Sequence, residues 1–440
     1  MIPGMASQNV PGRMTVWSEA PLPCAPQLEG TTHVDVAIIG AGFAGLSSAR
    51  FLKEADSSLN IALVDRAHAG FGASGRNAGI LSPFLPVPWL VGCSANERRL
   101  DDVRFAARYI ARETQEFTRL IEREAIACDL RPTQIVTTGA SGFYRHHLGL
   151  VAERCLLAGL PCHIATPEEL EAAFPYPAHG GFVLEGHVLQ PLALVQGLRR
   201  FVQRLGVRIY ENTCVMQLRP ARAGVEVPTN SGACLKADKV ILATNAYTHQ
   251  LGLGDWHRIP RPITTYLLAT APLDCAGMKQ LRFESRTIVD IGGEYFYARL
   301  LQNRLLFGGF DRPSSTSDES PDGDAPYHKR LRTEMTRRFP SLEDVPIDAQ
   351  WSGPYHQSRT HVPIIRTLPH MPDVILNIGY GGVGVTLTQF SGRIVAGLIL
   401  GEKHQDPDSD RMRGIYATTR LPVKEGIKLG LRLAVSLLRK

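Results

Sequence analysis

The sequence lacks the marks of several common protein classes. No stretch reaches the roughly 18 uninterrupted apolar residues of a membrane-spanning helix, and the N-terminal MIPGMASQNVPGRMTVW lacks the apolar core of a signal peptide. The 48 basic and 42 acidic residues are scattered, without a Lys/Arg block that could follow a phosphate backbone. We therefore expect a cytoplasmic protein with no integral membrane segment and no nucleic-acid partner.

Disulfide and metal-binding patterns are missing as well. The eight cysteines contain no CxxC and no zinc-like pairing, which favours reduced, buried thiols over a disulfide framework. The sequence also has no HExxH or HxxxH array, no clustered carboxylates with ligand spacing and no GxSxG. We therefore predict no metal site.

What is present is the composition of an ordinary globular protein. Of the 440 residues, 44% are hydrophobic and 20% are charged, and the net charge is +6. This length is about three times the usual length of one domain, so two domains are expected. Residues 421–440 form a basic amphipathic helical pattern, for which docking on the protein itself is favoured over contact with a membrane surface.

The stretch VAIIGAGFAGLSSARFL, which begins at Val36, places three glycines between an apolar run and a helical pattern. Gly40, Gly42 and Gly45 form GxGxxG. The first glycine permits a tight turn, the second lets a pyrophosphate touch the backbone, and the third brings helix and strand together. Asp65 ends the next predicted strand, where an acidic side chain holds a ribose diol. This strand–helix–strand unit predicts a parallel sheet and a bound ADP moiety.

Other elements follow from hydrophobic periodicity and turn residues. In chain order we expect helices over 96–129, 147–158 and 166–174, a helix from Pro191 to about Gly206, strands VRIYEN and CVMQL, a buried strand in ADKVILATNAY, antiparallel strands over 256–312, a surface loop SSTSDESPDGDAP, a helix over 327–339, and a last strand, glycine turn and helix in DVILNIGYGGVGVTLTQFSGRIVAGLILG.

The order of several motifs resembles one family. GFGASGRNAG, at residues 70–79, is a run of small residues suited to lie beside the rings of a ligand. Together with the GxGxxG unit, VLQPLALVQGLRR, KVILATNAYT, RLLFGGFDRP and NIGYGGVGVTLTQFSGRIVAGLI, it resembles the D-amino-acid-oxidase-like family of FAD-dependent oxidoreductases, in the branch that includes gamma-glutamylputrescine oxidase. The resemblance implies an α/β fold, in which a Rossmann-type FAD-binding domain is interleaved with a substrate domain built on an antiparallel sheet plus helices.

The resemblance also implies which residues contact the FAD. These fall on the pyrophosphate and ribose positions, an adenine-contacting strand, the loop near the isoalloxazine, the turn after the ADKVILATNAY strand, and a last glycine turn whose N–H groups face the pyrimidine end of the flavin. They are Gly40, Gly42, Phe43, Ala44, Gly45, Asp65, Arg66, Ser74, Arg76, Asn77, Ala78, Val215, Ala243, Thr244, Asn245, Gly381, Gly382, Val383, Gly384, Val385 and Thr386. Because Cys275 lies in no motif for a covalent flavin link, we expect non-covalent FAD.

Candidates for the substrate pocket come from two segments. In EYFYARL, Tyr297 and Arg299 share one face of an extended strand, and relatives place a Tyr and an Arg hereabouts against substrate. The planar fork of an arginine suits a carboxylate, although a salt-bridged strand arginine is an equal alternative. In WSGPYHQSRTHVP, Tyr355 and His356 are further candidates, with a structural histidine as the alternative for His356.

This sequence departs from the family pattern near the flavin. Ser358 replaces a Thr, Thr360 replaces an Asp or Asn, and Val383 stands where relatives often carry His. Because these positions lie close to the expected flavin, the family pattern does not fix the substrate or the electron acceptor of this protein.

The expected reaction is oxidation of the C–N bond of a small-molecule amine or amino acid to an imine, by hydride transfer to flavin N5, with O2 as acceptor. One alternative is a dehydrogenase that passes electrons to a quinone or carrier. The other is a flavin-binding subunit of a multi-subunit amine dehydrogenase.

The expected division of the chain has four kinds of segment. Residues 1–33 form an extended lead-in, residues 34–95, 180–255 and 350–420 the FAD-binding domain, residues 96–179 and 256–349 the substrate domain, and residues 421–440 a C-terminal amphipathic helix.

Overall fold

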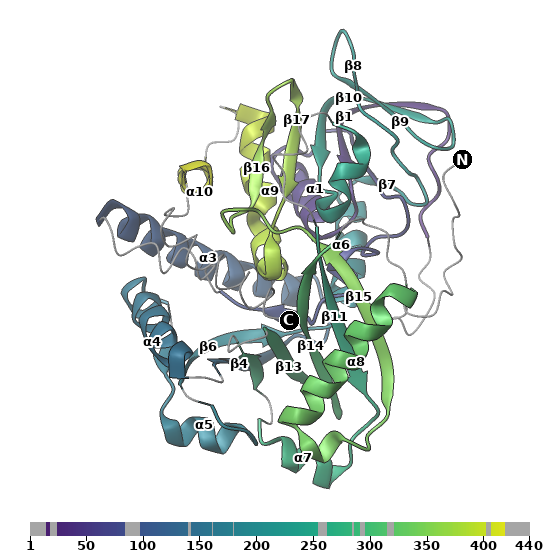
Figure 1. Cartoon of the computed structure of the whole chain (residues 1–440). Coiled ribbons are helices and arrows are strands. Elements are labelled where there is room, and N and C mark those ends of the chain that lie inside the picture. Colours follow the sequence, from purple (N-terminus) through teal and green to yellow (C-terminus); the bar gives the residue numbers. More distant parts are fainter. Residues whose placement is uncertain are drawn as a thin grey trace.

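The structure is a computed structural model, and it describes residues 15–17, 24–83, 97–139, 142–160, 162–178, 180–253, 262–283, 286–290, 295–314, 321–401 and 406–418. These residues form two β-sheets, which lie in the upper and lower halves of Figure 1, with helices packed around them. The predicted C-terminal helix lies outside the described residues.

Parallel strands dominate the first sheet. The bounds of its strands are β1 Thr31–Ile39, β2 Ile61–Val64, β7 Arg208–Tyr210, β8 Arg219–Pro220, β9 Val225–Pro228, β10 Cys234–Leu242, β16 Ile364–Leu368 and β17 Met371–Ile378. Their order is β16–β17–β10–β1–β2–β7, with β9 and then β8 paired beside β10. The strands from β17 to β7 are parallel to one another. All four residues of β2 are buried, as expected for a parallel sheet covered on both faces.

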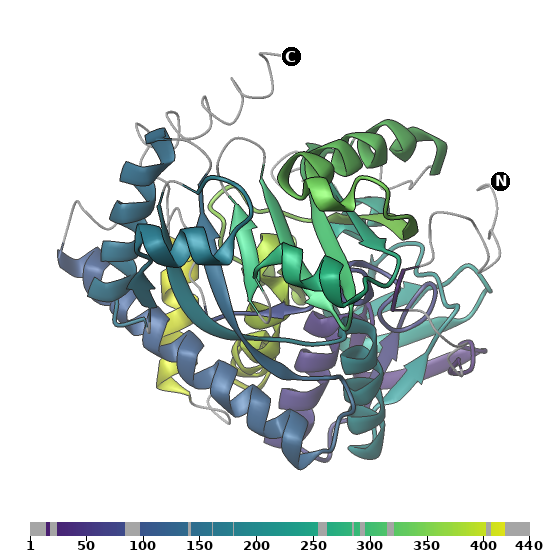
Figure 2. The same ribbon diagram turned by 90° about the horizontal axis from the view of Figure 1, so that it is seen from below.

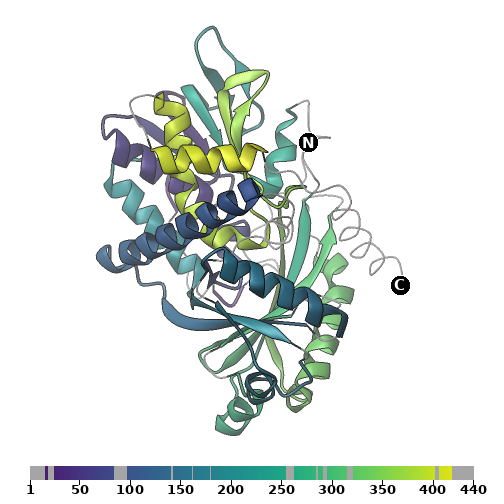
Figure 3. The same cartoon turned by 90° about the vertical axis from the view of Figure 1, so that its left-hand side faces the viewer.

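Helices cover one face of the first sheet. They are α1 Phe43–Ala55, α3 Glu97–Arg123, α6 Pro191–Arg204, α9 Gly384–Leu400 and α10 Pro407–Thr418. Val36 and Ile38 of β1 pack into the core under these helices, whereas Ala37 and Ile39 pack into a second core on the opposite face. This alternation follows from the two-residue period of a strand. Figure 3 shows α10 lying across the layer that contains α3 and α9.

Helices α1 and α9 pack closely against each other. A side chain at Gly392 of α9 would place its Cβ 2.1 Å from the carbonyl oxygen of Ser47, so only glycine fits this contact. The Ser47 hydroxyl accepts a hydrogen bond from the Gly392 amide at 3.2 Å. The segment 381–400 is the one helix in the described ranges that is apolar and long enough to cross a membrane. It packs here as the core helix of the first sheet.

The second sheet is mostly antiparallel. The bounds of its strands are β3 Ile80–Leu81, β4 Arg131–Thr138, β5 Cys162–Ile164, β6 Gly181–Val188, β11 Ile263–Thr270, β12 Thr287–Asp290, β13 Phe296–Leu301, β14 Arg304–Pro313 and β15 Ile347–Tyr355. Their order is β15–β11–β14–β13–β12–β4–β6–β3, with β5 on β6. Strands β12 and β4 are parallel, and the other pairs are antiparallel.

The two faces of the second sheet meet different neighbours. The helices of this half are α4 Gly142–Leu157, α5 Pro167–Ala173, α7 Cys275–Leu281 and α8 Pro321–Arg338. Phe296 and Ala298 of β13 pack under α8 on one face. On the other face, Tyr297 packs with Trp17 and Trp351. Figure 2 shows α8 on the side of this sheet opposite α3, so the face that carries Tyr297 is the face turned toward the first sheet.

Two predicted elements differ from the structure. The segment 214–218, CVMQL, forms only a single bridge from Val215 to Thr229, because the preceding residues turn back to bond the end of β2, where the Thr213 amide donates to the Asp65 carbonyl at 2.8 Å. Helix α8 begins at Pro321, inside the predicted loop, and proline is favourable in the first turn because its missing N–H needs no partner.

The predicted division into domains stays a prediction, but strand pairing favours different boundaries. Residues 181–188 and 347–355 were assigned wholly or mostly to the FAD-binding part, and both pair in the second sheet as β6 and β15. Helix α3, assigned to the substrate part, packs against α9 beside the first sheet. The chain therefore passes between the two halves more often than the sequence pattern indicates.

Candidate functional site

The ends of three parallel strands define one edge of the first sheet. Strands β1, β10 and β17 run in the same direction, so their carboxyl ends meet there. Gly40, Ala243 and Gly379 follow these three strands, and the Ala243 amide donates to the Ile39 carbonyl at 2.9 Å. Ligands of open α/β sheets bind outside this edge.

Each glycine of the GxGxxG motif lies in a close contact, with backbone at Gly40 and Gly45 and with a serine side chain at Gly42. A Cβ at Gly40 would lie 2.8 Å from the Ala243 oxygen, and φ there is +106°. At Gly45 it would lie 1.9 Å from the Gly40 oxygen, so the helix could not approach the strand. At Gly42 it would lie 2.8 Å from Ser74 Oγ, in the turn that opens α1. The tight turn predicted at Gly40 and the close helix–strand approach predicted at Gly45 therefore have a physical basis in this backbone, whereas the approach of a pyrophosphate at Gly42 stays a prediction.

The amino end of α1 is built to receive a negative charge. Its first turn, which contains Phe43, Ala44 and Gly45, carries no acidic residue, and Gly42 supplies no side-chain cap. The Phe43 amide donates to Ser74 Oγ at 2.9 Å. No acidic side chain of this turn therefore neutralises the positive end of the helix dipole. A helix end of this kind suits the negative charge of a pyrophosphate.

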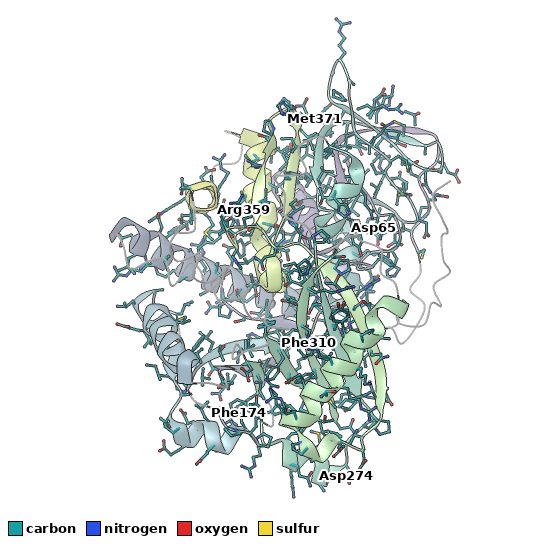
Figure 4. The ribbon with its side chains drawn as sticks, viewed as in Figure 1. Asp65, Phe174, Asp274, Phe310, Arg359 and Met371 are labelled. Carbon is teal, nitrogen blue, oxygen red and sulfur yellow. The ribbon has the colours of Figure 1, made fainter. Side chains whose placement is uncertain are left out.

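Asp65 ties the glycine turn to the end of β2. Its Oδ2 accepts the Ala41 amide at 2.8 Å and its Oδ1 accepts the Ala67 amide at 2.9 Å. Burial raises the pKa of Asp65, and these two hydrogen bonds oppose that rise. Each carboxylate oxygen keeps one further lone pair, which suits a ribose hydroxyl. Figure 4 labels Asp65 in the upper half of the molecule.

Two predicted residues flank Asp65. Val215 follows Thr213, whose amide bonds the Asp65 carbonyl, and it is nearly buried. The Arg66 guanidinium lies 4.1 Å from the centre of the Tyr247 ring and donates to Gln250 at 3.0 Å. Arg66 is therefore held against the 3-10 helix Asn245–Leu251.

The loop 70–79 is held in place by its own amide side chain. Asn77 Nδ2 donates to the carbonyls of Ala73 and Ser74 at 3.0 and 2.9 Å, and its Oδ1 accepts the Gly79 amide at 2.7 Å. The Trp17 indole donates to the Asn77 carbonyl at 3.1 Å. Asn77 therefore stabilises the conformation of the loop, because its side-chain amide is hydrogen-bonded to backbone atoms of the loop.

The same loop is fastened to the second sheet. Arg76 is buried, donates to the Ser352 carbonyl at 3.3 Å, and has its own carbonyl bonded by the Trp351 indole at 2.8 Å. Its guanidinium lies 4.7 Å from the Phe71 ring centre. Ala78 packs in the cluster that contains Trp351. The loop therefore joins β15 to the edge where β1 ends.

A second helix begins at the same edge. The 3-10 turn Gly381–Val383, which includes Gly382, leads into α9 at Gly384, and the first turn of α9 has no acidic residue and no side-chain cap. The Gly381 amide donates to the His356 carbonyl at 3.0 Å. Since α1 and α9 follow parallel strands and pack together, their positive ends point toward one region.

Polar side chains hold this second turn. Asn245, with φ of +44°, accepts the Gly379 amide at 3.2 Å, and Thr244 shares a hydrogen bond with Thr248 at 2.8 Å. The Thr386 hydroxyl bonds both the amide and the carbonyl of Ser82, whereas Val385 is nearly buried.

Sequence reasoning missed one acidic residue on the second sheet. Phe310 has φ of +60°, and the pairing of β11 with β14 shifts register beside it. Leu305, Phe307 and Phe310 all pack on the α8 face, so the irregularity reverses the alternation and turns Asp311 to the other face. Bulges commonly re-aim a side chain next to an active site. Figure 4 shows Phe310 in the middle of the molecule, between Asp65 above and Asp274 below.

Asp311 bonds Tyr355 and lies near Tyr297. The Tyr355 hydroxyl donates to Asp311 Oδ2 at 2.8 Å, and the Thr265 hydroxyl, which donates to the Gly309 carbonyl at 3.4 Å, lies beside Asp311 and Tyr297. Burial raises the pKa of Asp311 and of both tyrosines. The tyrosines stay protonated at neutral pH and can donate. The paired glycines in RLLFGGFDRP are the sequence signal that could have pointed to this carboxylate.

Arg299 and His356 were predicted to lie at the substrate, and the structure places both in buried surroundings. Arg299 is 4% exposed, donates to the Leu189 carbonyl at 2.9 Å and lies 5.3 Å from the Trp17 ring centre. Burial lowers its pKa to about 10. His356 is also buried, with Nδ1 3.3 Å from the place of a Cβ on Gly379. These contacts favour a supporting role for Arg299, whereas the role of His356 at the substrate stays a prediction.

Metal and disulfide chemistry find no support in the described ranges. No group of three or more His, Cys, Asp or Glu side chains there is arranged to hold a metal ion. The cysteines of those ranges are free thiols.

Comparison with known proteins agrees with this geometry. Residues 35–398 match the family model described as FAD dependent oxidoreductase. The probable oxidoreductase OrdL of Haemophilus influenzae is 31% identical over 389 residues, covering 86% of this chain and 85% of the relative. The gamma-glutamylputrescine oxidoreductase of Escherichia coli is 28% identical over 383 residues, covering 84% of each.

Solved structures show the same fold. Glycine oxidase from Geobacillus kaustophilus aligns with a TM-score of 0.69 at 21% identity, covering 85% of this chain and 96% of that one. The predicted α/β fold with two interleaved halves is confirmed. The family's cofactor is FAD, and the glycine cradle, the open amino ends of α1 and α9, and Asp65 fit it. The chain belongs to the family of FAD-dependent oxidoreductases.

Proposed function

We propose that this enzyme oxidises the C–N bond of a small-molecule amine or amino acid to an imine and uses O2 as the electron acceptor. The observation that carries the proposal is the meeting of two helix amino ends and a polar strand face. The polar face carries Tyr297, Asp311 and Tyr355. Relatives named for amine and amino-acid chemistry, a gamma-glutamylputrescine oxidoreductase and a D-amino acid dehydrogenase, support the substrate class.

The cofactor side of the site follows from the described contacts. The backbone around Gly42 and the first turn of α1 would hold the pyrophosphate, and Asp65 the ribose, with Arg66 and Val215 beside it. The loop that contains Ser74, Arg76, Asn77 and Ala78, the turn Ala243–Asn245 and the turn Gly381–Thr386 would surround the ring system. The amino end of α9 would stabilise negative charge there.

Bound FAD would supply the hydride acceptor of the reaction. The protein's own residues would orient the substrate and exclude water. Tyr355 and Tyr297 lie on one face of the sheet, where the Tyr355 hydroxyl donates to Asp311. Loop 70–79 connects the two halves of the molecule, because hydrogen bonds of Arg76 and Trp351 attach it to β15.

The position of Cys275 favours a cofactor that is not covalently bound. Cys275 follows Asp274, which Figure 4 labels at the lower end of the molecule, away from Asp65. We therefore propose that acid or denaturant releases intact FAD into solution.

Purification and an anaerobic titration test the proposal. The protein should carry a flavin absorption spectrum, which amines or amino acids should bleach without oxygen and which air should restore with formation of hydrogen peroxide. Bleaching that air does not reverse, but a quinone does, would indicate a dehydrogenase. A flavin that no amine or amino acid bleaches would overturn the proposal and favour a subunit without its own substrate chemistry.

A further inference from the structure

We propose that Asp311 is the counter-ion for the ammonium group of the substrate, and that the enzyme prefers amines without a carboxylate on the reacting carbon. The proposal rests on the proposed function and names its substrate class.

The position of Asp311 results from a local irregularity of β14. Leu305 and Phe307 point to the α8 face, and an unbroken strand would send the side chain of residue 311 there as well. The turn at Phe310, with φ of +60°, instead places Phe310 on the α8 face. Arg312 confirms the new alternation, because it lies over the Tyr327 ring of α8. Asp311 therefore faces the first sheet with Tyr297.

Hydroxyl groups surround the carboxylate. Tyr355 donates to Oδ2 at 2.8 Å, and the Thr265 hydroxyl, which donates to the Gly309 carbonyl at 3.4 Å, lies beside the carboxylate. Tyr295 and Tyr297, whose ring centres are 5.9 Å apart, complete the neighbourhood. None of these groups carries a positive charge, and in the described part of the chain no arginine, lysine or histidine forms an ion pair with Asp311.

A partly buried carboxylate with no cation beside it in the described residues is unfavourable, and a ligand that brings a positive charge removes this cost. The hydrogen bond from Tyr355 leaves further lone pairs on the Asp311 oxygens, and the residue keeps part of its surface accessible. An ammonium group carries three N–H donors and the missing charge. Asp311 thus has the charge, the spare acceptor sites and the access that binding of an amine requires.

The same charge opposes a substrate carboxylate. Among the described residues near this face, Arg299 binds the Leu189 carbonyl and Arg76 binds the Ser352 carbonyl. An α-amino acid would bring its carboxylate close to its ammonium group and therefore close to Asp311. Like charges in a partly desolvated site repel strongly. An amine should therefore be a better substrate than the amino acid that differs from it only by a carboxylate on the reacting carbon.

Matched substrates provide the first test. Phenethylamine and phenylalanine, putrescine and ornithine, and butylamine and norvaline each differ by one carboxylate. The rate of anaerobic flavin bleaching at low substrate concentration should be at least about 10-fold higher for the better amines than for either enantiomer of the matching amino acids. Faster bleaching by the amino acids would overturn the proposal and leave C–N oxidation standing.

Substitution of the carboxylate provides the second test. Asp311→Asn should retain FAD but lower kcat/KM for the best amine about 10- to 100-fold, the scale of a lost charge-assisted hydrogen bond, mainly through KM. The ratio between amine and amino acid should shrink with it. Asp311→Glu should recover part of the loss. Asp373→Asn, which removes a surface carboxylate paired with Lys239, is the matched control and should leave the constants unchanged.

The outcomes separate the two proposals. Unchanged kcat/KM in Asp311→Asn with a normal flavin spectrum would show that Asp311 binds no substrate. Absence of bleaching by every amine and amino acid in the wild-type enzyme would overturn the proposed function and this inference together. If Asp311→Asn loses its flavin, the role of Asp311 is tested instead by the matched substrates in the wild-type enzyme and by kcat/KM of the Asp311→Glu variant.

Discussion

The Tyr355 hydroxyl donates to Asp311 Oδ2 at 2.8 Å, joining the end of β15 to the irregular part of β14. Strand β11 lies between these two strands in the sheet. The bond therefore spans three strands and holds a carboxylate on the face turned toward the first sheet.

Removing this hydroxyl should change the pH dependence of the reaction. The hydrogen bond from Tyr355 opposes the rise of the Asp311 pKa caused by burial. In Tyr355→Phe the pKa of Asp311 should rise further, so the acidic limb of the kcat/KM profile for an amine should move to higher pH. Steady-state rates between pH 5 and 9 would check this, and an unmoved limb would show that another group controls it.

The pH dependence of the stability of the FAD-free protein should also reveal the raised pKa of Asp311. Its folded-state pKa is raised above that of an unfolded aspartate, roughly 3.9. Ionisation of Asp311 therefore stabilises the unfolded state relative to the folded state. The resulting loss of folding stability is absent at pH values below the unfolded-state pKa and complete at pH values above the folded-state pKa. Asp311→Asn should raise the melting temperature of the apoprotein at pH 8 relative to wild type, and this gain should shrink toward pH 4. A gain equal at both pH values would contradict an elevated pKa.

Gly42→Val should abolish retention of FAD. A side chain at this position would approach Ser74 Oγ within 2.8 Å and stand where the pyrophosphate must meet the backbone. Gly397→Val, in α9 with no atom within 4 Å of its added Cβ, is the control and should keep its flavin. The ratio of absorbance at 450 nm and 280 nm measures the result, and a yellow Gly42→Val protein would refute the placement.

Asp65→Ala should weaken FAD binding by about 1 to 3 kcal/mol, the scale of a lost charge-assisted hydrogen bond. The variant loses the ribose acceptor and also the bonds to the Ala41 and Ala67 amides, so the glycine turn should loosen. Titration of apoprotein with FAD measures the affinity. Equal affinity for wild type and variant would mean that the ribose is held elsewhere.

Arg299→Lys should reduce stability more than substrate binding. The arginine bonds the Leu189 carbonyl and stacks on Trp17, and lysine keeps the charge without the planar group. We expect a lower melting temperature with KM for the best amine within about twofold of wild type, a difference of less than 0.5 kcal/mol. A large rise in KM at unchanged stability would restore Arg299 as a substrate anchor.

The glycine turn at the end of β1 could be predicted from local sequence signals. Gly40, Gly42 and Gly45 act through contacts with residues near them in the chain or at the ends of neighbouring strands, and their spacing carries that information. Asp311 could not be found in this way, because its direction depends on the backbone turn at Phe310 and on pairing with β11, more than forty residues away in sequence. The shared strand face of Tyr297 and Arg299 was predicted, but the distant carbonyl of Leu189 engages the arginine.

The most direct measurement of the central claim is a single turnover without oxygen. The purified enzyme is mixed with one equivalent of its best amine, and the flavin absorbance, the aldehyde or ketone, and the released ammonia or amine are measured together. The proposed C–N oxidation predicts one carbonyl product and one nitrogen product for each flavin bleached, since water hydrolyses the imine. Bleaching without release of a nitrogen product, or a substrate recovered unchanged with oxidised flavin, would contradict it.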